Sequence, residues 1–162
     1  MKSTTELENK LNELISSQQT LMMATANLDA LPEVSVTPFV QNSAGCFYIL
    51  VSDLAGHTAN LQKNPKISVL VVRPEAECTN PFARERAIFN CQVREVSKSD
   101  PIYAAQIQAL TNKFGETVRL LNSLPDFHLF ELRPESGRYV LGFGQAYQID
   151  VLNQRLIPIE RK

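Results

Sequence analysis

The sequence predicts a mainly β fold of the α+β class, in which an antiparallel β-barrel is flanked by helices. Strand-like segments, about seven or eight in all, follow one another in runs and do not alternate strictly with helices. Helical periodicity appears at only three places. The 162 residues, of which 44% are hydrophobic and 20% charged, suit a single domain over 1–162 with a substantial core.

The N-terminal half is expected to begin with a helix and to continue as a β-meander. Ser3 and Glu6 fit a capping box, and leucines then recur at helical spacing. Residues 34–40 alternate in a way that indicates a half-buried strand. The expected elements are a helix at about 4–17, strands at 20–26, 34–40 and 46–52, a short helix at 57–63 and a strand at 66–73.

The C-terminal half combines the longest strand with a helical region. Asp100 suits a helix N-cap, Pro101 suits the first helical position and Gly115 suits the end of that helix. The expected elements are a strand at 85–97, helices at about 101–114 and 116–123, and strands at 126–134, 138–144 and 146–151.

Charge, hydropathy and cysteine spacing exclude several classes of function. Sixteen basic and 17 acidic residues give no general attraction to nucleic acid. No apolar run approaches the roughly 20 residues that cross a bilayer, and the polar N-terminus lacks a signal-peptide core, so we expect a cytoplasmic protein without a membrane partner. Three widely spaced cysteines without a C-x-x-C pair argue against a zinc site.

The segment SDLAGHTAN (52–60) is the richest polar constellation. Ser52, Asp53 and Thr58 surround a glycine where a strand passes into a short helix. Such a junction can offer backbone N–H groups and hydroxyls to a phosphate or carboxylate, or it can be an ordinary turn. His57 lies at the start of the helix, where it is either a ligand or a turn residue.

Three arginines border the loop between two strands. Arg73, Arg84 and Arg86 could bind phosphate or carboxylate through paired hydrogen bonds, or could pair with the glutamates of the same loop. The second histidine, His128, lies in an alternating strand, where an exposed role is the simpler interpretation. No dinucleotide fingerprint, P-loop or metalloprotease motif occurs in the sequence.

Three separated segments carry a family resemblance. FYILVSDLAGHTANLQKNPKISVLVV, NPFARERAIFNCQV and LPDFHLFELRPESGRYVLGFGQAY resemble the HugZ/HutZ-type heme-utilisation proteins, which belong to the pyridoxamine 5′-phosphate oxidase-like, FMN-binding split-barrel superfamily. The resemblance spans about residues 5 to 150. It implies a split barrel, a homodimer, and a site between the two protomers for a small, planar, anionic cofactor, either heme or FMN.

The resemblance also implies site residues. The places that match the FMN phosphate site of flavin-using relatives are Ser52, His57, Thr58, Arg84 and Arg86, and the family motif adds Asp53 and Asn60. Arg73 completes the expected cofactor-binding set. Asp126, the carboxylate of the LPDF motif, and His57 are the expected catalytic residues, and His57 is the candidate ligand for heme iron.

One feature departs from the heme-degrading members. Those proteins carry a later histidine that binds the iron, whereas no histidine follows His128 in this sequence. Without that partner, Asp126 loses the role of orienting a ligand histidine. Three functions therefore stay open: a heme-binding protein that degrades heme oxidatively to release iron, an FMN-dependent oxidoreductase, and a cofactor-binding protein that is not an enzyme.

Overall fold

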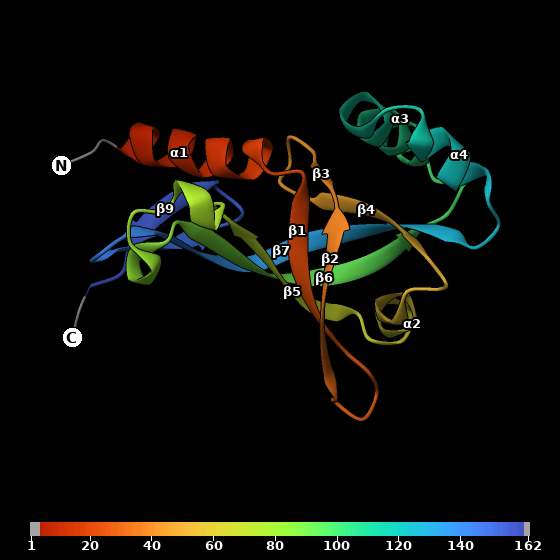
Figure 1. Ribbon diagram of the computed structural model, residues 1–162, viewed down its shortest axis with the longest axis horizontal. Coiled ribbons are helices and arrows are strands. Elements are labelled where there is room, and N and C mark those ends of the chain that lie inside the picture. The colour runs from red at the N-terminus through yellow and green to blue at the C-terminus, as the bar shows by residue number, and fades with distance from the viewer. Residues whose placement is uncertain (1–3, 161–162) are drawn as a thin grey trace.

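The computed structural model describes residues 4–160, which form four α-helices packed around one antiparallel sheet (Figure 1). Ser3 of the expected capping box lies outside the described residues. The helices are α1 (Thr4–Ser17), α2 (Gly56–Lys63), α3 (Tyr103–Phe114) and α4 (Thr117–Ser123). The strands are β1 (Thr20–Ala26), β2 (Pro32–Pro38), β3 (Val40–Gln41), β4 (Phe47–Ser52), β5 (Lys66–Val72), β6 (Arg86–Val96), β7 (Phe127–Gly142), β8 (Gln145–Asp150) and β9 (Arg155–Pro158).

The sheet has nine strands, and its main path runs β2-β1-β5-β6-β7-β4-β3. All pairings are antiparallel, and β8 and β9 extend the sheet from the far end of β7. In the described part of the chain, no backbone ladder joins β2 to β3. The antiparallel architecture with flanking helices is thus confirmed, and the ladder stays open between its two end strands.

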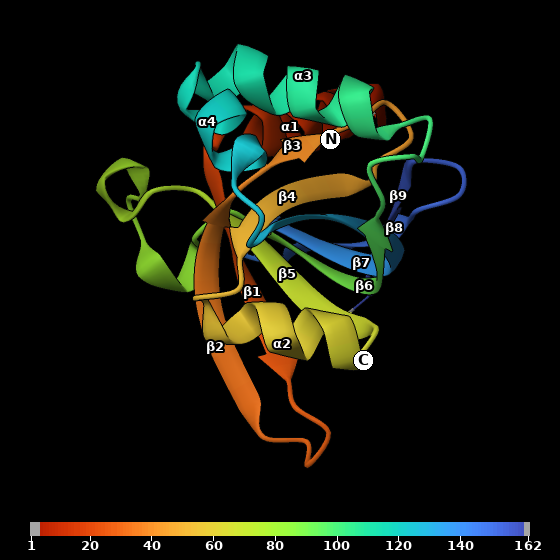
Figure 2. The same cartoon turned by 90° about the vertical axis from the view of Figure 1, so that its right-hand side faces the viewer.

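Two apolar clusters hold the helices against the sheet. The larger cluster joins Leu14 of α1 to the inner face, where the rings of Phe47 and Phe89 meet edge to face at 5.3 Å. The smaller cluster joins Tyr103 of α3 to Tyr48 of β4. Figure 2 shows α2 on the opposite side of the sheet from α3 and α4. None of the helices in residues 4–160 is long and apolar enough to cross a membrane.

The structure differs from the sequence expectations at three strands. β7 is continuous over 16 residues where two strands were expected, because a register shift opposite Pro134 lets β6 and β7 stay paired on both sides of the proline. Strand β9 was not expected. A half-buried strand was expected at 34–40. The structure has β2 at Pro32–Pro38 and exposes the face that was expected to be buried, since Val34 is 75% exposed and Val36 61% exposed.

Candidate functional site

The turn between β4 and α2 is fixed to the segment that precedes β7. Ser52 Oγ donates to Asp126 Oδ2 at 2.8 Å and accepts the backbone N–H of Leu54 at 3.1 Å. The backbone N–H of Asp53 donates to the carbonyl of Asp126 at 2.8 Å. A serine that bonds two residues ahead favours a turn here. The structure therefore brings the two sequence motifs, SDLAGHT and LPDF, into direct contact.

Polar side chains on α2 anchor that helix to the sheet. Thr58 Oγ1 donates to the carbonyl of Ser52 at 2.6 Å. Asn60 Nδ2 donates to Thr25 Oγ1 at 3.0 Å and to Glu33 Oε2 at 3.2 Å. Because buried polar groups need partners, these bonds fix the position of α2. Thr58 and Asn60 thus position the junction through contacts within the chain.

His57 lies in the first turn of α2 and is only 8% exposed. Burial lowers the pKa of His57, and the negative charge of Glu33 opposes this effect only partly. The ring is therefore neutral at pH 7. Its Nε2 atom is buried and has no hydrogen-bond partner among the described residues. A buried polar atom without a partner needs an explanation, and a missing ligand is one.

His128 joins this junction, although the sequence analysis did not include it among the site residues. Its Nδ1 lies 2.6 Å from Glu95 Oε1 and its Nε2 lies 2.8 Å from Asp53 Oδ1. Burial alone would lower the pKa of His128, but the two carboxylates raise it. The alternation of residues 126–134 had predicted that His128 lies in a strand. The pairing with Glu95 depends on the register between β6 and β7, which no local pattern reveals.

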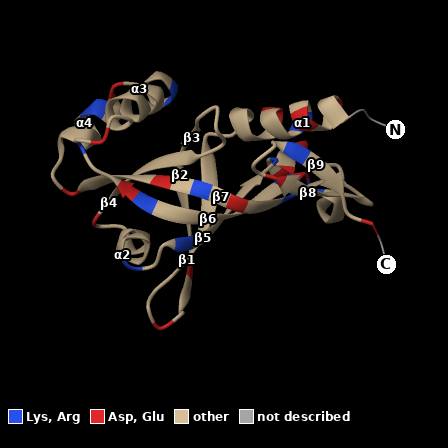
Figure 3. Ribbon diagram, turned by 180° about the vertical axis from the view of Figure 1, so that it is seen from behind, with Lys and Arg blue, Asp and Glu red and all other residues tan. Residues whose placement is uncertain are grey.

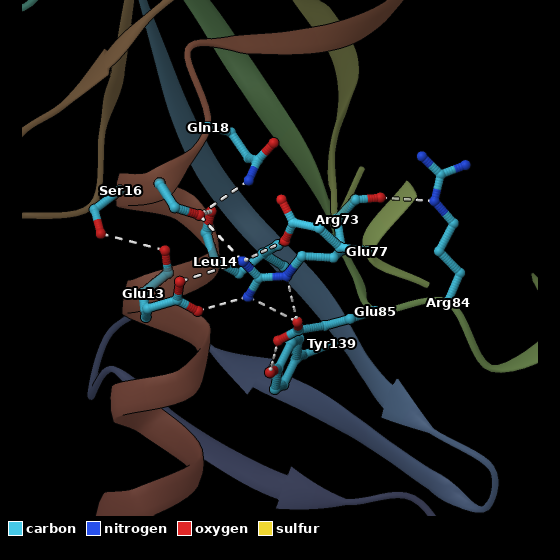
Figure 4. Close-up of polar contacts among 10 residues, drawn as sticks. Glu13, Leu14, Ser16, Gln18, Arg73, Glu77, Arg84, Glu85 and Tyr139 are labelled. Atoms are coloured by element: carbon cyan, nitrogen blue, oxygen red, sulfur yellow. Dashed lines mark hydrogen bonds and ion pairs between the residues drawn. The ribbon is translucent and has the colours of Figure 1, made fainter. Parts of the chain in front are cut away.

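Arg73 lies at the other end of β5, where it anchors α1 (Figure 4). Its guanidinium pairs with Glu13 Oε2 at 2.5 Å and with Glu85 Oε2 at 2.8 Å. Tyr139 donates to the other oxygen of Glu85 at 2.5 Å. These carboxylates raise the pKa of Arg73, so the cation is permanent. Its side chain is already engaged by Glu13, by Glu85 and, at 3.8 Å, by Glu77 of the same chain.

Arg84 and Arg86 have fewer partners. Arg84 donates from Nε to the carbonyl of Arg73 at 2.7 Å, and its Nη1 lies 3.9 Å from Glu75. Arg86 donates from Nη1 to the carbonyl of Arg84 at 2.8 Å. Because an arginine carries five N–H donors, both guanidinium groups keep donors for an external anion.

The junction and the arginines lie at opposite ends of the sheet. Along β7, Ser52 pairs with Phe127 whereas Arg86 pairs with Val140. At about 3.3 Å a residue, these positions are about 40 Å apart along the strand. Figure 1 shows α2 at one end of the molecule and the segment after β5, beside α1, at the other. A single chain therefore does not bring all the expected site residues together.

An apolar row crosses the outer face of the sheet between these ends. Val36 of β2 pairs with Met22 of β1, which pairs with Leu70 of β5, which pairs with Ile88 of β6. Val36 and Met22 are exposed, and the row ends beside the exposed Arg138 of β7. Arg86 shares this face with Ile88 because it lies two residues before it. Elsewhere, charges of both signs are interspersed over the chain (Figure 3).

A cavity of about 850 Å³ lies apart from the expected site residues. It opens between α1, the turn after β3 and the β8–β9 hairpin, and Leu11, Phe89 and Ile149 form part of its wall. None of the expected site residues lines it. The cavity is thus separate from the candidate site.

Comparison with known proteins assigns the family. The chain matches the pyridoxamine 5′-phosphate oxidase family over residues 7–141. It belongs to this family. Within it, the chain is 38% identical over 143 residues to a Vibrio cholerae serotype O1 protein named heme oxygenase HutZ, an alignment that covers 88% of this chain and 81% of that one. The HutZ-type heme-utilisation branch expected from the three sequence segments is thus confirmed.

Solved structures of family members have the same fold. A Vibrio cholerae HutZ structure, described as a heme storage protein, superposes with a TM-score of 0.75 at 36% identity and covers 80% of this chain and 90% of its own. Campylobacter jejuni ChuZ superposes with a TM-score of 0.86 at 26% identity and covers 98% of this chain and 64% of its own.

Proposed function

We propose that this protein binds heme at the interface of a homodimer and supports its oxidative breakdown, which releases iron. The observation that carries the proposal is the apolar row on the outer sheet face, which ends beside arginines. A flat apolar ring with two carboxylates suits such a surface, because apolar area favours the ring and guanidinium groups favour the acids. The names of the relatives, heme oxygenase and heme storage protein, support the same ligand.

The same surface supports the proposed homodimer. Val34 and Val36 expose β-branched side chains on a strand at the end of the sheet path, where a second copy would remove them from water. In the homodimer that we propose, a twofold axis through this face would bring the arginine end of one copy near the β4–α2 junction of the other. The two halves of the expected site, which are far apart in one chain, then form one site.

Each expected residue has a role in this proposal. Arg84 and Arg86 bind the propionates, and Arg73 holds the loop that carries them. His57 offers Nε2 to the iron, Thr58 and Asn60 hold α2 in place, and Ser52 orients Asp126 and the Asp53 turn. Bound heme supplies the iron chemistry that activates O₂.

A heme titration of the purified protein tests this proposal. We expect a sharp Soret band that saturates at a fixed ratio of heme to chain, and its loss over time with ascorbate and O₂. His57→Ala should abolish the band and free imidazole should restore it, whereas Gln148→Ala, an exposed change on β8, should do neither. Failure of the wild-type protein to give any Soret shift would reject heme binding.

Two alternatives give different results in the same experiment. The family match favours an FMN-dependent oxidoreductase, for which the untreated protein would be yellow and absorb in the flavin bands. The HutZ structure described as a heme storage protein favours a non-enzymatic carrier. A carrier would give a Soret band that persists with ascorbate and O₂.

A further inference from the structure

The cavity between α1 and the β8–β9 hairpin has an apolar floor that belongs to the core. Phe89 of β6 and Ile149 of β8 come together over Gly137 of β7, where an added Cβ atom would lie 2.9 Å from a carbon of each side chain. Leu11 of α1 and Leu156 of β9 complete the floor. All four side chains are buried in the larger apolar cluster, so packing fixes the shape of the floor. A volume of about 850 Å³ is in the range of cavities that hold small molecules.

Gln154 joins two sides of this cavity from the turn between β8 and β9. Its Nε2 donates to the carbonyl of Ser43 at 3.1 Å, which connects this turn to the turn after β3. The φ of Gln154 is 52°, a left-handed conformation that glycine adopts at lower cost. The chain therefore keeps a strained residue where its side chain bridges the two turns. Strain of this kind is typical of positions with a function beyond folding.

Arg155, the next residue, gives the rim of the cavity a positive charge without a carboxylate partner. Within residues 4–160, no acidic side chain forms an ion pair with it. Asp150 pairs with Arg155 across the hairpin, but its carboxylate oxygens accept from N–H groups of Leu152 and Asn153. The guanidinium of Arg155 thus keeps its donors for an external acid.

The other charges at the rim leave the balance in favour of an acid. Glu13 is neutralised by its ion pair with Arg73. Arg133 pairs with buried Glu131 through Nη2 and keeps further N–H donors, since its side chain is 64% exposed. Glu8 of α1 is the remaining carboxylate at the rim, and it forms no ion pair in the described part of the chain. Two guanidinium groups with spare donors therefore outweigh one carboxylate.

We propose that this cavity binds a single-chain carboxylic acid of medium length, with its chain on the apolar floor and its carboxylate beside Arg155. Removal of apolar area from water favours the chain, and paired hydrogen bonds to a guanidinium favour the acid. The inference goes beyond the proposed function, because none of the expected heme-site residues lines this cavity.

Octanoate and octanol test the proposal by isothermal titration calorimetry, since they share a chain and differ in the head group. The wild-type protein should bind one octanoate per chain, about fivefold more tightly than octanol. Arg155→Gln should bind the two ligands equally. Arg119→Gln, an exposed change on α4, is the matched control and should keep the preference for the acid. Absence of octanoate binding, equal affinities in the wild type, or a preference that persists in Arg155→Gln would overturn the proposal.

A second pair of variants tests the location of the ligand. Ala44→Trp adds a large ring at an exposed position on the rim and should weaken binding of both ligands. Ala105→Trp, the same change at an exposed position on α3, should alter neither affinity. In the wild-type protein, octanoate should shift the methyl NMR signals of Leu11 and Ile149. Methyl shifts confined to the apolar row of the outer face, or unchanged octanoate affinity in Ala44→Trp, would reject the cavity as the binding site.

Discussion

Ser52 and Asp126, which are far apart in the sequence, meet in a 2.8 Å hydrogen bond between Oγ and Oδ2. The bond joins the end of β4 to the segment that leads into β7, and the two strands are paired from that point onward. Since the Asp53 N–H also donates to the Asp126 carbonyl, the junction is held by both side chain and backbone. These two hydrogen bonds make Asp126 a residue that holds the candidate site in shape.

Ser52→Ala should therefore weaken the junction. The change removes a hydrogen bond to a carboxylate and leaves the Leu54 N–H without its acceptor. We expect a loss of about 1–2 kcal/mol in the free energy of unfolding, measured by urea denaturation. Ser136→Ala, which removes a 3.2 Å bond between exposed side chains, is the control and should cost less than about 0.5 kcal/mol. Equal losses in the two variants would contradict the role assigned to Ser52.

Arg73→Gln should destabilise the protein more strongly. The guanidinium is 17% exposed and pairs with Glu85, which is 15% exposed, and with Glu13 of α1. Removal of the cation leaves Glu85 with an uncompensated charge beside buried Tyr139. We expect a loss of about 2–4 kcal/mol by urea denaturation.

A matched control separates this network from ordinary surface pairs. Arg119 and Glu116 form an exposed pair at 3.6 Å on neighbouring turns, so Arg119→Gln should change stability by less than about 0.5 kcal/mol. If Arg73→Gln were as mild as Arg119→Gln, α1 would not depend on the Arg73 network.

His128 should make the stability depend on pH. The carboxylates of Glu95 and Asp53 raise its pKa in the folded protein above the ordinary value of 6.5. A raised histidine pKa means that the folded state holds the proton more tightly than the unfolded state. The stabilising contribution is therefore complete below the ordinary pKa, and it is lost as the pH rises through the folded value.

His57 should act in the opposite direction. Burial lowers the pKa of His57 in the folded protein, so its neutral form stabilises the protein at pH values above the ordinary pKa. This contribution is lost as the pH falls toward the lowered pKa.

Urea denaturation at about pH 5 and about pH 8.5 should show His128→Asn losing more stability at the lower pH. NMR titration of the two rings should give a higher pKa for His128 than for His57. A lower pKa for His128 than for His57 would contradict the environments that we assign to the two rings.

The sequence predicted most of the elements because their periodicities are local. The leucines of α1 and the β-branched residues of β5 indicated a helix and a strand that the structure contains with nearly the same bounds. Two separate strands were expected before and after residues 135–137, yet β7 is continuous there because Glu135 is left without a partner between Pro134, which pairs with Cys91, and Ser136, which pairs with Asn90. The residues that pair on both sides of Glu135 belong to β6, and so no pattern within 126–144 could reveal this continuity.

The sequence predicted the local positions of the candidate site residues but not their arrangement in space. It placed Ser52, His57 and Thr58 where a strand passes into a short helix, and the structure has them at the end of β4 and the start of α2. The sequence could not place Arg84 and Arg86 at the far end of the sheet, since that depends on strand order. Glu33 went unnoticed because its hydrogen bond with Asn60 joins two elements with no shared sequence pattern.

Val36→Glu should separate the proposed homodimer into monomers. Val36 is 61% exposed at the β2 end of the apolar row, so a charge there would be buried without a partner when two copies associate. In the monomer the new side chain faces water, and the fold should be kept. Sedimentation at micromolar concentration should give twice the mass of one chain for the wild type and the mass of one chain for the variant. Leu120→Glu, at a 64% exposed position on α4, should stay dimeric. A wild-type monomer, or a Val36→Glu dimer, would remove this face as the subunit interface and with it the shared heme site.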